Sequence, residues 1–419
     1  MIDPTLIKNL RGAWSLLSEE DQAPIQAQME TAHQALLQFL ETQQPPDIEG
    51  VRHELLYANA ILHPLEAGDI LIRAFALALK QSNGDFQPPI DKYGDIWGFG
   101  QYEQLDFRWV EALLSLLLNG KYRFPFGTDV PAILSLPQDN FKVAVMGDWG
   151  TGDWGSDPGT CPAQKISNFI QSYQPDIVIH LGDVYYAGSA SQESGNLLQP
   201  WPKATWGNFT LNSNHEMYPG GRYYSSEALA SPIFARQAGH SYFAIETNSW
   251  IFLGLDSAYY ADARQLYMNG SLWEAGAEDT PQTTLIQQVT AKGKPVILFS
   301  HHNPLGYTGE INPDAPLYGQ LTSILPNPAY WYYGHIHIAA VYIDNVVNDG
   351  GRYRCLGHGA LPWGKASVLQ TPNVAWTETT PIPDSPDKRL ANGFAILSFQ
   401  GGNVTETYYT EDNHVSYTR

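Results

Sequence analysis

Cysteine, basic residues and long apolar runs are all scarce in this 419-residue chain. Two cysteines, Cys161 and Cys355, are too few for a disulfide framework. The 23 Lys and Arg face 43 Asp and Glu, a formal net charge of −20, which argues against binding nucleic acid or anionic membranes through a basic surface. No run of 18 apolar residues occurs, and no basic segment followed by an apolar one opens the chain. We therefore expect a soluble, cytoplasmic protein without membrane association.

The chain is long enough for two domains. Apolar residues at helical spacing over 18–40, 71–79 and 110–118 predict an α-helical N-terminal domain spanning residues 1–135, whose protein partner no sequence feature identifies. From Phe141 onward, strands alternate with helices and long loops, which predicts an α/β catalytic domain over residues 136–419. Near its end, two alternating segments flank Gly401-Gly402 and predict a β-hairpin.

Five short motifs in the second domain carry side chains that bind metals. In chain order they are Gly147-Asp148-Trp149-Gly150, Gly182-Asp183-Val184-Tyr185-Tyr186, Asn214-His215-Glu216, His301-His302-Asn303-Pro304 and Gly334-His335-Ile336-His337. The clearest ones directly follow apolar runs, at 141–146, 177–181 and 296–299, that predict buried strands. The side chains therefore gather at the carboxyl ends of strands, where open α/β sheets place their sites. Carboxylates, an amide, a phenol and several imidazoles suit a pair of divalent or trivalent metals.

The first motif is followed at once by a second Gly-Asp-Trp that begins at Gly152. Only the first copy directly follows a predicted strand, so Asp148 is the expected metal ligand, and Asp153 is expected to cap a turn or helix. The Gly-rich segment lacks the Lys-Ser/Thr ending of a nucleotide-binding P-loop, which excludes that function here.

In this order the motifs resemble those of the calcineurin-like metallophosphoesterases, and within them the purple acid phosphatase branch. The family pattern is GD-x-G, GD-x-x-Y, GNH-D/E, V-x-x-H and GH-x-H, and the resemblance covers roughly residues 140–360. Two positions differ: Ser213 replaces the usual Gly, and Leu298 or Phe299 replaces the usual Val. If the loop needs a positive φ at Ser213, the side chain costs more there than glycine would. The resemblance implies a four-layer α/β/β/α sandwich.

The resemblance also implies a function. It is hydrolysis of small phosphate esters by a dinuclear metal-dependent phosphatase, through attack of metal-activated hydroxide. The implied ligands are Asp148, Asp183, Tyr186, Asn214, one of His301 and His302, His335 and His337. Asp183 would bridge the metals; one metal would also bind Asn214 and His335, and the other Asp148, Tyr186 and His337. His215 would stay off the metals and protonate the leaving group. A phenolate favours Fe(III) at one position, with Fe(II), Zn or Mn at the other.

The two neighbouring histidines of the fourth motif are not separated by the sequence. His301 is the first ring after the apolar run, whereas an H-x-P spacing to Pro304 favours His302. Adjacent residues on an extended chain face opposite ways, so only one ring is expected to point at the metals. We favour His301 because it lies closer to the predicted strand.

Two other functions remain open. The same metals could serve a phosphodiesterase acting on cyclic nucleotides or other diesters. Alternatively, the protein could be a metal-binding scaffold, which should have lost ligands or the catalytic histidine. This chain retains all of them, which favours an enzyme.

Overall fold

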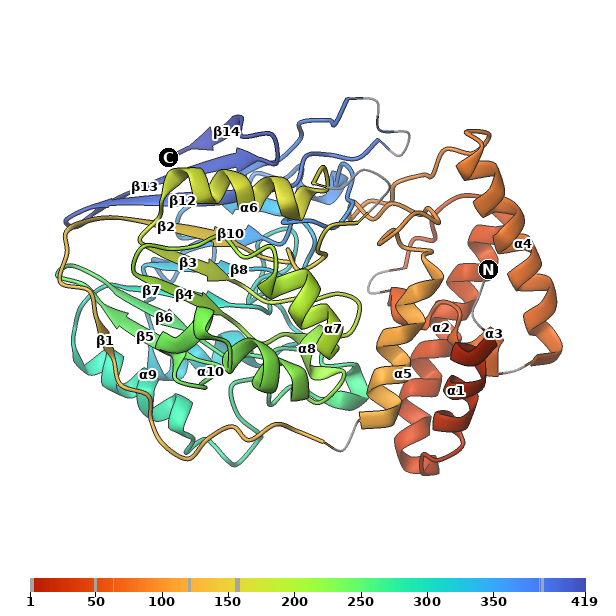
Figure 1. Cartoon of the computed structure of the whole chain (residues 1–419), viewed down its shortest axis with the longest axis horizontal. Coiled ribbons are helices and arrows are strands. Elements are labelled where there is room, and N and C mark those ends of the chain that lie inside the picture. Colours follow the sequence, from red (N-terminus) through yellow and green to blue (C-terminus); the bar gives the residue numbers. More distant parts are fainter. Residues whose placement is uncertain are drawn as a thin grey trace.

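The computed structural model describes residues 4–48, 51–62, 64–119, 122–154, 159–383, 385 and 388–419. Figure 1 shows a helical N-terminal region packed against one end of a two-sheet sandwich. The α-helices are α1 (Pro4–Trp14), α2 (Glu19–Thr42), α3 (Ala58–Leu62), α4 (Pro64–Ser82), α5 (Val110–Asn119), α6 (Pro162–Tyr173), α7 (Ala190–Gln192), α8 (Asn214–Met217), α9 (Pro281–Ala291) and α10 (Leu317–Ile324). The helices predicted in the N-terminal region are confirmed as α2, α4 and α5.

Two sheets form the centre of the molecule. Their strands are β1 (Leu134–Ser135), β2 (Asn140–Met146), β3 (Ile177–His180), β4 (Gly207–Thr210), β5 (Phe243–Glu246), β6 (Ile251–Gly254), β7 (Val296–Ser300), β8 (Tyr330–Tyr333), β9 (Ala339–Tyr342), β10 (Arg352–Leu356), β11 (Val374–Thr377), β12 (Gly393–Gln400), β13 (Asn403–Thr410) and β14 (Val415–Thr418). One sheet has the order β1-β5-β6-β7-β8-β10-β9-β11, and the other β14-β13-β12-β2-β3-β4. The predicted hairpin is confirmed as β12 and β13.

Buried aromatic and aliphatic side chains hold the two sheets together. Phe252 of one sheet contacts Phe141 and Phe399 of the other, with ring centroids 5.8 and 5.2 Å apart. Helices α9 and α10 cover the outer face of the larger sheet, and α6 packs on the outer face of the smaller one. The predicted four-layer α/β/β/α sandwich is confirmed.

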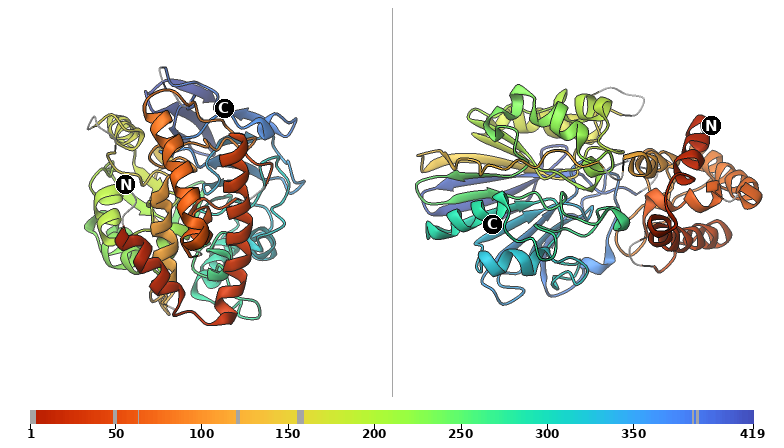
Figure 2. Two further views of the ribbon diagram at one scale, coloured as in Figure 1. Left: turned by 90° about the vertical axis from the view of Figure 1, so that its right-hand side faces the viewer. Right: turned by 90° about the horizontal axis from the view of Figure 1, so that it is seen from below.

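The carboxyl ends of the central strands face the helical region. Strands β2 and β3 are parallel neighbours in one sheet, and β7 and β8 are parallel neighbours in the other. Figure 2 shows the N-terminal helices gathered at one end of both sheets. The motifs that follow these strands are therefore enclosed between the sandwich and the N-terminal region.

The division of the chain after residue 135 stays a prediction. Strand β1 pairs in parallel with β5 and so already belongs to the larger sheet. Within the described ranges, no helix has both the length and the apolar character needed to cross a membrane.

Candidate metal centre

Asp148 and Asp183 follow β2 and β3 directly and lie side by side. Both have left-handed backbone conformations, with φ of 53° and 80°. The amide of His335 donates to Asp148 Oδ2 at 2.9 Å, which brings the loop after β8 onto the same carboxylate. A Cβ at Gly334 would overlap this oxygen, so the close approach requires glycine there.

One group of donors forms around Asp148. The Tyr185 hydroxyl lies 2.7 Å from Asp183 Oδ2, 3.3 Å from Asp148 Oδ1 and 3.3 Å from His337 Nε2. His337 Nε2 is also 3.5 Å from Asp148 Oδ1. Asp148, Asp183 and His337 have the spacing of a group able to hold a metal ion.

A second group shares Asp183 with the first. His301 Nε2 lies 2.9 Å from Asn214 Oδ1, 3.1 Å from His335 Nδ1 and 3.3 Å from Asp183 Oδ1. His301 Nδ1 lies 3.0 Å from the Leu181 carbonyl, which can only accept. Nδ1 is therefore the protonated nitrogen, and Nε2 presents a lone pair to the centre. Asp183 thus stands between two donor groups, in the place of a bridging ligand.

The structure places Tyr186 differently from the sequence prediction. Its hydroxyl donates to Asp106 Oδ2 at 2.5 Å, and its ring stacks on Tyr102, so the side chain joins the N-terminal region. The neighbouring Tyr185 hydroxyl occupies the position at Asp148 and Asp183 that was expected for Tyr186. The assignment of Tyr186 as a metal ligand, still a prediction, is therefore not favoured by this geometry, which presents Tyr185 as the candidate phenol.

Both nitrogens of His302 are engaged by the protein. Nδ1 lies 2.8 Å from the Ser257 hydroxyl, and Nε2 lies 2.7 Å from the Tyr267 carbonyl. The ring nevertheless packs against His335, with centroids 4.6 Å apart. His302 thus packs beside the ligand candidates with both ring nitrogens already bonded to the protein. This geometry favours His301 as the ligand, which is still a prediction.

Ser213 fits the loop without strain. Its φ of −137° and ψ of −179° are extended backbone, so the expected need for a positive φ is absent. Its hydroxyl contacts Asp183 Oδ1 and Glu216 Oε2 and accepts from the His215 amide at 3.0 Å. Serine here therefore orients the central carboxylate, which glycine could not do.

The electrostatics of the centre suit cations. Burial and the adjacent Asp183 raise the pKa of Asp148 well above its ordinary value. Burial lowers the pKa of His301 and of His337 to about 3, so both rings are neutral, which is the form that binds metals. The donor set therefore fits two metal ions: it consists of two buried carboxylates, neutral imidazoles, an amide oxygen and a phenol.

His215 lies beside these donors without joining them. Its Nδ1 lies 2.6 Å from the Tyr186 carbonyl and therefore donates to it. Its Nε2 is 3.9 Å from Asp183 Oδ2 and 3.8 Å from Glu54 Oε1. The ring is thus fixed with Nε2 facing the carboxylates.

The sequence did not identify two N-terminal residues at this site. Glu54, in the short 3₁₀ helix η1 (His53–Leu55), is fully buried and accepts from the Tyr218 hydroxyl at 2.8 Å. His53 Nε2 lies 3.2 Å from Glu54 Oε1, and its ring stacks near those of His215 and His337. No local motif surrounds either residue, and only the packing of the N-terminal region brings them here.

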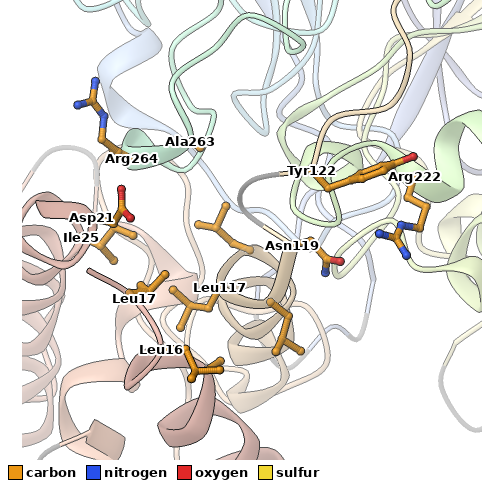
Figure 3. A pocket seen from close by; sticks show the side chains of 13 residues that line it. Leu16, Leu17, Asp21, Ile25, Leu117, Asn119, Tyr122, Arg222, Ala263 and Arg264 are labelled. Atoms are coloured by element: carbon orange, nitrogen blue, oxygen red, sulfur yellow. The ribbon is translucent and has the colours of Figure 1, made fainter. Parts of the chain in front are cut away.

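Asp153 and one cavity lie apart from the centre. Asp153 accepts from the Gly159 amide at 2.9 Å, and its role in capping a turn or helix stays a prediction. The cavity, of about 500 Å³, has a lining that includes Leu16, Leu17 and the leucines at 116–118 (Figure 3). Its lining includes none of the motif residues, so it is not the site of the predicted chemistry.

Residues 141–339, which contain all five motifs, match the family model of the calcineurin-like phosphoesterases. The chain therefore contains a calcineurin-like phosphoesterase domain, and the chemistry of such domains is metal-dependent hydrolysis of phosphoesters. No curated protein matches the chain in sequence.

Several solved structures are distantly similar. GAP50, the anchor in the inner membrane complex of Plasmodium, aligns at 11% identity and a TM-score of 0.46, covering 67% of this chain and 88% of its own. A conserved uncharacterised protein of Streptococcus pneumoniae, a predicted phosphoesterase, aligns at 9% identity and 0.27, covering 67% and 97%. A candidate 5′-nucleotidase of Staphylococcus aureus in complex with alpha-ketoglutarate aligns at 10% identity and 0.34, covering 66% and 52%.

Proposed function

We propose that this protein is a phosphatase of the purple acid phosphatase type, which hydrolyses phosphate monoesters at a dinuclear metal centre. The observation that carries the proposal is the pair of donor groups that share Asp183. One contains Asp148, Tyr185 and His337, and the other contains Asn214, His301 and His335. Fe(III) beside Fe(II), Zn or Mn suits a set that includes a phenol.

When bound, two such ions would polarise the phosphoryl group and lower the pKa of a water molecule. The reaction forms a bond between the oxygen of water and phosphorus, and it breaks the bond between phosphorus and the alcohol oxygen. His215 Nε2 supplies the proton that the departing alcohol oxygen takes. The carboxylates of Glu54 and Asp183 both lie within 4 Å of this nitrogen.

The repeated Gly-Asp-Trp segment offers a matched experiment. Asp148→Asn removes a candidate ligand, whereas Asp153→Asn changes the equivalent residue of the second copy, which is exposed and accepts from the Gly159 amide. Release of 4-nitrophenol from 4-nitrophenyl phosphate and from bis(4-nitrophenyl) phosphate is measured for each full-length variant after loading with iron, zinc or manganese.

We expect the monoester to be the better substrate. Asp148→Asn should lower kcat/KM by at least about 100-fold, the upper range for disturbing a metal site, and Asp153→Asn should leave it unchanged. Equal loss in both variants, or no hydrolysis by any loaded form of the wild type, contradicts the proposal. Faster cleavage of the diester would make the protein a phosphodiesterase.

A further inference from the structure

A cavity of about 410 Å³ opens beside the metal centre, between the N-terminal region and the catalytic loops. Its walls come from residues 51–54 and 91–95 on one side and from 303–314 on the other. His335 and His337 form part of the same lining. A phosphate group held at the centre would therefore have the remainder of its ester in this cavity.

The lining of this cavity is strongly acidic. Its carboxylates are those of Glu54, Asp91, Asp95, Glu310 and Asp314. Arg52 is the one lysine or arginine among the lining residues, so the carboxylates outnumber the strongly basic side chains. Two metal ions at the centre can neutralise a phosphate dianion. The carboxylates of the cavity would instead surround the alcohol part of the substrate, which carries no phosphate.

Glu54 places in this lining a carboxylate oxygen that has no hydrogen-bond partner in the described part of the chain. The side chain is fully buried, and Oε1 accepts from Tyr218 while Oε2 has no hydrogen-bond partner among the described residues. A buried carboxylate oxygen without a donor destabilises the folded protein, so a ligand that donates to it would be favoured. Because Glu54 also lies 3.8 Å from His215 Nε2, this donor would sit close to the leaving group.

Asp95 presents a second carboxylate without a hydrogen-bond donor to its side chain among the described residues. Burial and the neighbouring Asp91 raise the pKa of Asp95 to about 7, which shows that its negative charge is poorly compensated. Asp91 itself is engaged, since it accepts from the amides of Tyr93 and Asp95. Asp95 is therefore the carboxylate in this wall that is most available to a ligand.

Aromatic rings complete the cavity. Tyr93 and Tyr307 both line it, with ring centroids 4.9 Å apart. Ring faces attract ammonium groups, so these residues favour the same kind of ligand as the carboxylates.

Building on the proposed function, we infer that the substrate is a phosphate ester whose alcohol part carries a positive charge, such as an aminoalkyl phosphate. The phosphate lies at the metal centre, and the ammonium group lies among Glu54, Asp95 and the tyrosine pair. Hydrolysis of the ester then releases a protonated amino alcohol. A highly anionic substrate, such as a nucleoside triphosphate, would be repelled by the same lining.

Phosphonates separate binding from chemistry, because their carbon–phosphorus bond is not hydrolysed. Calorimetric titration of the metal-loaded full chain compares 2-aminoethylphosphonate with propylphosphonate, which has a methyl group in place of the ammonium. We expect the amine to bind about tenfold more tightly, the size of a partly buried charge interaction. Asp95→Asn should reduce this preference about fivefold, whereas Asp139→Asn, an exposed residue outside the cavity, should leave it unchanged.

Hydrolysis provides the second readout. The ratio of kcat/KM for 2-aminoethyl phosphate to that for 2-hydroxyethyl phosphate should fall in Asp95→Asn and stay unchanged in Asp139→Asn. Equal binding of the two phosphonates overturns this inference but leaves the proposed phosphatase intact. Tighter binding of 2,3-dihydroxypropylphosphonate than of the amine would show that the cavity selects hydroxyl groups. Failure of every phosphonate to bind, together with no phosphate release, overturns both proposals.

Discussion

Replacing the two adjacent tyrosines one at a time separates a metal-binding role from a structural one. The Tyr185 hydroxyl lies between Asp148, Asp183 and His337, whereas the Tyr186 hydroxyl donates to Asp106. Tyr185→Phe should weaken metal binding by at least roughly 10- to 100-fold, since even disturbing residues around metal ligands has effects of that size. Tyr186→Phe should leave the metal content unchanged.

The effect of each change on stability follows from the hydrogen bonds that remain. In Tyr186→Phe, Asp106 keeps Arg108 at 2.9 and 3.0 Å and the Tyr102 amide at 2.9 Å, so the free energy of unfolding should fall by only about 1 kcal/mol. In metal-free Tyr185→Phe, the loss of a 2.7 Å bond to a buried carboxylate should cost about 1.5–3 kcal/mol.

Three measurements on the same variants test these values. They are elemental analysis of loaded protein, visible absorbance of the Fe(III)-loaded form, and denaturant unfolding of the metal-free form. A phenolate bound to Fe(III) should colour the wild type and Tyr186→Phe, and the colour should disappear in Tyr185→Phe. If Tyr186→Phe loses the colour and a metal while Tyr185→Phe keeps both, the geometric argument is refuted.

Three further variants test the surrounding residues. His301→Ala should empty or weaken one metal site, whereas His302→Ala should keep the metals and change mainly the kinetics; elemental analysis showing the reverse would exchange their roles. His215→Ala should retain both metals and lose about 10²–10⁴ in kcat, more for poor leaving groups than for activated ones, and loss of a metal instead would make it a ligand. Burial lowers the pKa of His180 to about 3, so below pH 6.5 the unfolded chain binds a proton that the folded chain does not. Stability should therefore fall by about 2 kcal/mol per such residue between pH 7 and pH 5, and urea unfolding of His180→Asn should show a decrease smaller by this amount.

The layered fold could be predicted from the sequence because its central strands are continuous apolar runs. Strands β3 and β7 are buried on both faces, as is β2 from Val143 to Met146, and a motif residue follows each run at once. The ends of parallel strands meet at one edge of a sheet, so the convergence of Asp148 and Asp183 followed from their positions alone.

The choice between the two tyrosines could not be made in the same way. Tyr185 and Tyr186 are adjacent and chemically identical, and a spacing rule counts residues without knowing how the backbone turns after Asp183. The partner that holds Tyr186 is Asp106, which lies 80 residues earlier in a different part of the fold. A side chain whose position depends on such a distant contact gives no local signal.

The residues that the N-terminal region adds to the site could not be predicted from the sequence for the same reason. His53 and Glu54 follow no predicted strand and belong to no motif, and η1, which contains them, is only three residues long. They reach His215 because the helical region packs across the end of the sandwich. Nor could the sequence show that Ser213 would support Asp183 through its hydroxyl.

Anomalous X-ray scattering from crystals of the iron- and zinc-loaded protein tests the central claim most directly. The dinuclear centre predicts two peaks that share Asp183, one beside Asp148 and His337 and the other beside Asn214, His301 and His335. A single peak would contradict it. So would ions bound instead at His53, Glu54 and His215, the third group of suitably spaced donors among the described residues.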